Sequence, residues 1–145
     1  MKTLAILTSL LLAAPLLAAE AMEGDTTLTE EPLLPPEERH IRAGIVLLGT
    51  IYNTLARVND AQSAQMAVPT IVRLTREVQT WAQGVAALPP LDDESRSLYE
   101  ERYLPIITRI NDYLRAQGER LAASGYFGSQ DLSTALMSLY NTTRQ

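Results

Sequence analysis

Residues 67–88, AVPTIVRLTREVQTWAQGVAAL, decide the fold of this chain. Apolar side chains recur in this stretch at alternating steps of four and three residues, at Ala67, Ile71, Leu74, Val78, Trp81, Val85 and Leu88. An α-helix places positions with this spacing on one face, and polar residues occupy the opposite face here. The pattern therefore predicts a central helix that other helices cover along one side.

Similar patterns on either side of this stretch predict the covering helices. We expect a first helix from about Pro36 to about Val58, and the central helix from Ala61 to Ala87. A third helix is expected over Ser95–Ser124 and a short fourth one after Ser129, whereas no stretch predicts a long strand. The sequence thus predicts an all-α protein, an antiparallel helical bundle of three long helices with a short C-terminal fourth. The short connection through two prolines predicts that the third helix is an antiparallel neighbour of the second.

Two prolines interrupt the predicted helices. Pro69 lies inside the second helix and Pro105 inside the third. A proline in a helix interior lacks the N–H that would bond the carbonyl four residues earlier, and its ring crowds that carbonyl. We therefore expect helices 2 and 3 to be kinked at Pro69 and Pro105.

The N-terminus has the features of a secretory signal peptide. Lys2 is followed by an apolar run over Leu4–Leu17, and Ala19-Glu20-Ala21 provides small residues for a cleavage site. We expect residues 1–21 to be removed after Ala21, with cleavage after Ala19 as the alternative, and the mature protein to be periplasmic or secreted in a bacterium. Residues 22–35 are acidic and contain proline, which predicts a flexible linker, and residues 36–145 then form a single helical-bundle domain.

Composition limits the partners that this chain can bind. It contains no cysteine, so disulfides and lipid attachment through an N-terminal cysteine are excluded, and Lys2 is the only lysine among its twelve basic residues. Residues 22–40 carry six acids against Arg39, while residues 41–145 hold ten acids and ten arginines. A neutral body without a basic stripe does not favour nucleic acid. The apolar run at the N-terminus is too short for a spanning helix, so no membrane span is expected after signal cleavage.

Catalytic and cofactor chemistry have few candidates. The only histidine, His40, lies near the start of the first helix beside Glu37 and Glu38, where we interpret it as a solvated residue. Haem held by His40 and either Met66 or Met137 is an alternative, but methionines at such positions more often fill a core. We therefore predict no catalytic residue, no metal site and no cofactor.

Two segments resemble a group of small secreted helical proteins of Gram-negative bacteria that have no assigned activity. One runs from Val58 to Ala64 and continues through Ala67-Val68-Pro69 to Ile71 and Leu74; the other combines 120–123 with 126–128, Leu132, Ala135 and Leu136. The resemblance covers roughly residues 42–140 and implies an exported helical bundle. It implies no ligand and no catalytic residue.

These observations favour two functions. The first is an exported, non-enzymatic interaction or scaffold module with an unknown protein partner or with self-association. The alternative is a periplasmic carrier of a small apolar ligand, with a haem-type bundle as a variant. The two proline bends are expected about 7 Å apart along the bundle axis, so they predict a gap for a ligand or partner that is bordered by Met66, Ile71, Tyr103 and Ile106. The alternative is that the prolines only curve the helices around a filled core.

Overall fold

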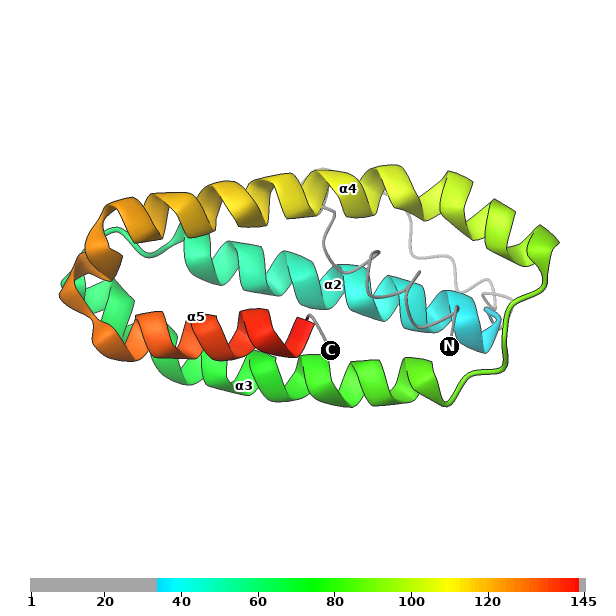
Figure 1. The fold of residues 1–145 in the computed structure, drawn as a ribbon, viewed down its shortest axis with the longest axis horizontal. Coiled ribbons are helices and arrows are strands. Elements are labelled where there is room, and N and C mark those ends of the chain that lie inside the picture. Colours follow the sequence, from blue (N-terminus) through cyan, green and yellow to red (C-terminus); the bar gives the residue numbers. More distant parts are fainter. Residues whose placement is uncertain (1–33, 144–145) are drawn as a thin grey trace, which may run out of the picture.

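The computed structural model describes residues 34–143, which form four α-helices and one short turn of 3₁₀ helix (Figure 1). The elements are α2 (Pro36–Ala56), α3 (Ala61–Ala86), α4 (Asp93–Ala123), η1 (Gly125–Gly128) and α5 (Gln130–Thr143). No strand occurs between residues 34 and 143, so the all-α prediction is confirmed. The predicted signal peptide, residues 1–21, and nearly all of the predicted linker lie outside the described residues. None of the helices within 34–143 is long and apolar enough to span a bilayer.

Aspartate side chains precede and cap two of the helices. At the start of α3, Asp60 accepts a hydrogen bond from the backbone N–H of Ser63 at 2.7 Å, and Ser63 Oγ accepts one from the N–H of Asp60 at 3.1 Å. Asp92 accepts an equivalent bond from the N–H of Ser95 at 2.7 Å before α4. These bonds lower the pKa of both aspartates, because they stabilise the ionised carboxylate.

The helices lie roughly along one axis, and their neighbours differ from the expected ones. α2 packs against α3 and α4, and α3 packs against α5. In Figure 1, α2 and α4 run in one direction while α3 and α5 run in the other. The expectation that α4 would be the antiparallel neighbour of α3 is therefore wrong, because α4 lies beside α2.

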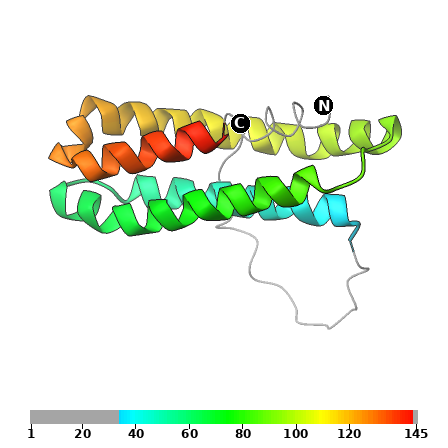
Figure 2. The same cartoon turned by 60° about the horizontal axis from the view of Figure 1, so that its bottom comes forward.

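The loop between α3 and α4 explains this placement. Residues 87–92 include Pro89 and Pro90, which hold the chain extended. The four residues 89–92 span up to about 13 Å when extended, whereas packed helices lie about 8–10 Å apart. The loop is therefore long enough to pass the start of α2, as Figures 1 and 2 show, and to bring α4 to the far side.

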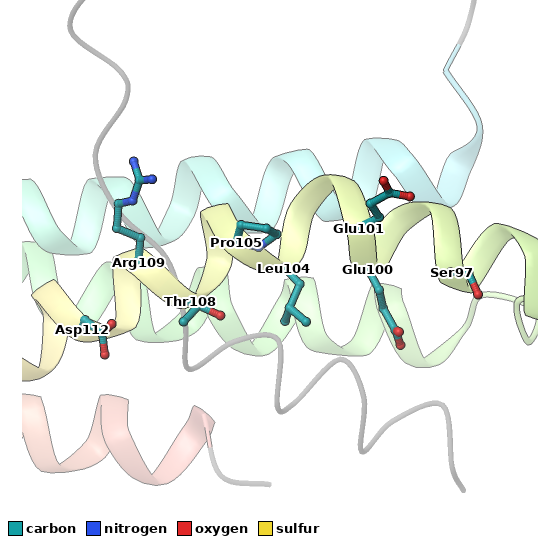
Figure 3. Close-up of a pocket in the computed structure, with 8 residues that line it drawn as sticks. All are labelled: Ser97, Glu100, Glu101, Leu104, Pro105, Thr108, Arg109 and Asp112. Atoms are coloured by element: carbon teal, nitrogen blue, oxygen red, sulfur yellow. The ribbon is translucent and has the colours of Figure 1, made fainter.

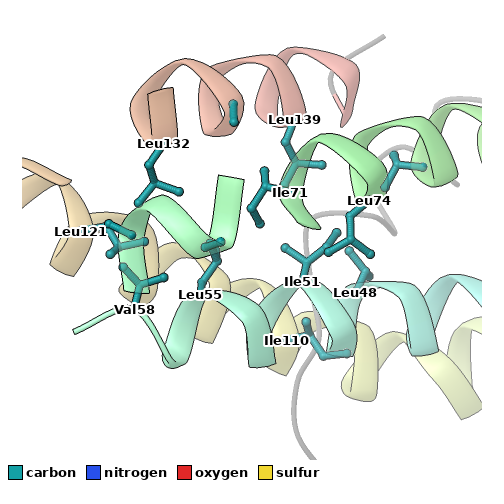
Figure 4. Close-up of a cluster of buried hydrophobic side chains, with 14 of the residues drawn as sticks. Leu48, Ile51, Leu55, Val58, Ile71, Leu74, Ile110, Leu121, Leu132 and Leu139 are labelled. Carbon is teal, nitrogen blue, oxygen red and sulfur yellow. The ribbon is translucent and has the colours of Figure 1, made fainter. Parts of the chain in front are cut away.

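The core contains the apolar face that the sequence predicts for α3. Ile71, Leu74 and Val78 have no measurable exposure, and they meet side chains from the other three helices (Figure 4). Trp81 is half-buried rather than fully buried. Its indole Nε1 donates a hydrogen bond of 2.8 Å to the backbone oxygen of His40, which fixes the ring at the edge of the core.

Two glycines allow α2 and α3 to approach closely, one at the ring of Trp81 and the other at the ring of His40. A Cβ atom at Gly44 would lie 2.7 Å from a carbon of the Trp81 ring, and one at Gly84 would lie 2.8 Å from Nε2 of His40. Each helix therefore offers a glycine to a ring of the other helix. His40 is thus packed against α3, and its Nδ1 lies 3.0 Å from the carbonyl oxygen of Pro36, so the expectation of a simply solvated histidine is incomplete.

The opposite end of the molecule is closed by Arg120. This side chain of α4 donates hydrogen bonds of 2.9 Å and 2.8 Å to the backbone oxygens of Leu55 and Val58, at the end of α2. A cation at this position suits the negative end of the helix dipole.

The chain then reverses in an unusual turn. Gly125, Tyr126, Phe127 and Gly128 all have positive φ angles, from 51° to 78°. Left-handed backbone costs about 1–2 kcal/mol for each residue other than glycine. Tyr126 and Phe127 are partly buried against the core, and this packing offsets the cost.

Candidate functional site

A buried carboxylate holds α4 against α2. Glu38 of α2 is only 5% exposed, and its Oε1 accepts hydrogen bonds from the hydroxyl of Tyr103, from Arg42 at 3.1 Å and from Arg102 at 3.2 Å. Arg42 also donates from Nε to the Tyr103 hydroxyl oxygen at 3.1 Å. These four side chains, named the Glu38 network below, orient the N-terminal half of α4.

The electrostatics of the Glu38 network show what it can do chemically. The hydrogen bond from Tyr103, together with Arg42 and Arg102, keeps the pKa of Glu38 below its ordinary value, although burial acts in the opposite direction. Glu38 is therefore ionised at neutral pH and holds no proton to donate as a general acid. The pKa of the neighbouring Tyr99 is raised by burial and by the negative charges of Glu38 and Glu37. The network therefore joins two helices through an ionised carboxylate.

Because Tyr103, Ile107 and Ile110 of α4 point into the core, the adjacent positions of this helix point outward. A shallow hollow follows this outward side, and its eight lining residues among residues 34–143 all belong to α4 (Figure 3). They are Ser97, Glu100, Glu101, Leu104, Pro105, Thr108, Arg109 and Asp112, and they are named the α4 stripe below. Leu104, which is 40% exposed, and Pro105 form its apolar centre, and charged residues lie on both sides of that centre.

The charges of the α4 stripe are only partly paired. Asp112 pairs with Arg115 of the same helix at 2.6 Å. Within residues 34–143, no ion pair involves Glu100, Glu101 or Arg109. Glu101 and Arg109 are eight residues apart, about 12 Å along the helix, so they do not reach each other within one chain. The stripe therefore combines exposed apolar groups with unpaired charges of both signs.

The four residues of the predicted gap divide into two pairs. Ile71 and Tyr103 both belong to the buried core. Met66 is 68% exposed and Ile106 is 37% exposed, and neither belongs to that core. The structure therefore buries two of the four residues and exposes the other two. The gap at the prolines stays a prediction.

The side chains considered for haem ligation lie in different parts of the molecule. The ring of His40 packs at Gly84, near the end of α3, whereas Met66 is close to the start of the same helix. The eighteen residues between positions 66 and 84 correspond to about 27 Å of helix. His40 and Met66 therefore do not face one haem. Met137 is 61% exposed, and no group of three or more potential metal ligands was found among residues 34–143.

Sequence reasoning missed both the Glu38 network and the α4 stripe. In the sequence, Glu38 is one of two acids beside His40 near the start of the first helix, and Glu100 and Glu101 are two acids of the third helix. One signal was available, since Glu38 and Arg42 have the spacing of an ion pair on a helix. Their contact with Tyr103 depends on the neighbour that α4 selects, and no local pattern contains that information.

The described geometry thus consists of a network that fixes α4 and of an exposed stripe on the same helix. Searches against protein-family models, curated proteins and solved structures found no match to this chain.

Proposed function

We propose that this protein is an exported, non-enzymatic interaction module that binds a protein partner through the α4 stripe. The observation that carries the proposal is the apolar centre of the stripe, Leu104 and Pro105, which is exposed between unpaired charges. Exposed apolar groups with a polar rim are typical of surfaces that bind other proteins. Export is proposed from the signal-peptide features of residues 1–21.

The Glu38 network supports this role because it fixes the helix that carries the stripe. Arg102 and Tyr103 come from α4, and both bond to one carboxylate oxygen of α2. A surface that is held in one orientation before binding loses less conformational freedom when a partner docks. The α4 stripe is therefore a preorganised surface.

We also propose that helices α3 and α4 bend at Pro69 and Pro105 within the bundle. Pro105 belongs to the α4 stripe, where it leaves the carbonyl of Glu101 without its usual helical partner. A bend at this point would shape the surface offered to a partner. Alanine in place of Pro105 would straighten α4, and a comparison of the helix axes in the two structures would test the bend.

Site-specific photo-crosslinking in the bacterial periplasm tests the function. A photoreactive residue at Leu104 is expected to give a discrete adduct with one partner, whereas the same residue at Gln79, an exposed position of α3, is expected to give none. Arg109→Glu, which reverses a charge within the α4 stripe, should reduce the yield of the adduct formed from position 104. Equal labelling from both positions, or an adduct that does not respond to Arg109→Glu, would contradict a specific interface on α4.

A further inference from the structure

The order of residues in the α4 stripe is symmetric. Positions at equal distances on either side of the point between Leu104 and Pro105 form four pairs, which are Ser97 with Asp112, Glu100 with Arg109, Glu101 with Thr108, and Leu104 with Pro105. Each pair combines groups that attract one another. The pairs are two polar combinations able to form hydrogen bonds, one acid with a base, and one apolar contact.

This symmetry has a direct meaning for a second copy of the same helix. When two identical helices pack antiparallel around a two-fold axis, positions equally far from the axis on opposite sides face each other. With the axis between Leu104 and Pro105, Glu100 of one copy faces Arg109 of the other, and the same contact occurs a second time. All eight residues of the stripe then meet a complementary residue of the partner.

We propose that the partner of the α4 stripe is a second copy of this chain, in an antiparallel α4–α4 dimer. This inference rests on the proposed interaction function and names its partner. Charge complementarity supports it, because Glu100, Glu101 and Arg109 belong to no ion pair within residues 34–143. Exposure supports it as well, since seven of the eight residues are exposed and Glu100 is half-buried.

The size of the contact between the two α4 helices determines the expected affinity of the dimer. The stripe from Ser97 to Asp112 is about 22 Å long, and a single helix pair buries less surface than a permanent dimer needs. The dimer is therefore a weak one that forms in the micromolar range. Exposed ion pairs add little affinity, so their main effect is to select the antiparallel register.

A charge-exchange experiment with the mature exported protein tests this dimer. Arg109→Glu places an acid opposite Glu100 and next to Glu101, and the double variant Glu100→Arg/Glu101→Arg places one cation opposite Arg109 and a second one beside it. Each variant alone should dimerise about tenfold more weakly than wild type in sedimentation equilibrium. An equimolar mixture of the two should form a heterodimer, because both pairs of facing charges are then opposite in sign.

Arg76→Glu is the matched control, since it makes the same change at an exposed position of α3 and should leave the dimer unaffected. Far-ultraviolet circular dichroism of every variant checks that it is folded. The chain contains no cysteine, so Leu104→Cys should give an intermolecular disulfide across the axis, while Gln79→Cys should give none.

Three results would overturn the dimer. The first is a wild-type protein that stays monomeric up to about 200 μM, well above the micromolar range expected of a weak contact. The second is a mixture of the two charge variants that forms no heterodimer. The third is an intermolecular disulfide that forms equally well from position 79. Crosslinking from position 104 to a different protein, with a monomeric wild type, would reject the second copy as partner and leave the interaction function standing. No adduct and no dimer would reject both.

Discussion

Arg120 illustrates how one residue joins distant parts of the chain. It belongs to the last turn of α4, yet it bonds two backbone oxygens at the end of α2. The last turn of a helix leaves its carbonyls without helical partners, and here the oxygen of Leu55 also accepts a bond of 3.1 Å from the N–H of Val58. A single guanidinium therefore satisfies acceptors of another helix and fixes the distance between the two helices.

We predict that Arg120→Ala lowers the free energy of unfolding by about 2–3 kcal/mol, because it removes two charge-assisted hydrogen bonds. Urea denaturation measures the loss. Arg115→Ala is the control, since its ion pair with Asp112 is exposed on both sides and should contribute about 0–1 kcal/mol. Equal losses in the two variants would show that Arg120 does not cap α2.

Glu38 gives a prediction about pH. Its folded pKa is lowered, so the stability that it contributes is complete above the ordinary glutamate pKa of about 4.3 and is lost as pH falls toward the lowered value. Melting temperatures between neutral and acidic pH measure the difference between wild type and Glu38→Gln. This difference should be constant above about pH 5 and shrink in more acidic solution.

Tyr103→Phe provides the control for this assignment. The hydrogen bond from Tyr103 is the largest cause of the lowered pKa of Glu38. Its removal should raise the folded pKa, so that the stability contributed by Glu38 is lost at a higher pH than in wild type. An unchanged profile would indicate that other carboxylates dominate the acid response.

At the scale of the elements, α2 carries two glycines with opposite expected effects. Gly44 faces the Trp81 ring, and a Cβ atom there would lie 2.7 Å from a ring carbon, whereas a Cβ at Gly49 meets nothing within 4 Å. Alanine favours a helix over glycine by about 1 kcal/mol at an unobstructed site. The two positions therefore separate helix propensity from packing between helices.

We predict that Gly49→Ala stabilises the protein by about 0.5–1 kcal/mol, while Gly44→Ala destabilises it by about 1–3 kcal/mol because α2 and α3 are forced apart. Thermal unfolding measures both values, and tryptophan fluorescence should shift to longer wavelength in Gly44→Ala alone. Stabilisation by both substitutions would mean that the Trp81 ring moves without cost.

At the scale of the whole molecule, α5 covers the side of α3 that α2 leaves free. Leu132 of α5 has no exposed surface, and Ala135 and Leu139 are also buried. The whole of α4 separates α3 from α5 in the sequence, and the left-handed turn at Gly125–Gly128 directs α5 toward α3.

We predict that truncation after Gly128 abolishes cooperative thermal unfolding, because it exposes the apolar side of α3 around Ile71 to water. Differential scanning calorimetry should show the loss, and the dye ANS should bind the truncated chain. Met137→Ala in the full chain is the control. Its side chain is 61% exposed, so the melting temperature should not change. A sharp transition in the truncated protein would show that α2, α3 and α4 fold without α5.

The sequence by itself determined the elements of this protein. The repeat of apolar residues from Ala67 to Val85 identified the buried face of α3, and the expected helix starts at Ala61 and Ser95 lie within two residues of those of α3 and α4. These features depend on residues three or four positions apart, so a short stretch contains the necessary information. The all-α class followed from them.

Tertiary structure decided how the elements meet. The placement of α4 beside α2 created the Glu38 network, directed Arg120 to the end of α2 and left the α4 stripe exposed. Local periodicity shows that a helix has an apolar face but does not say which helix covers it. That choice depended on the reach of an extended proline loop and on close packing at Gly44 and Gly84, because contacts between distant residues form only when the whole chain is folded.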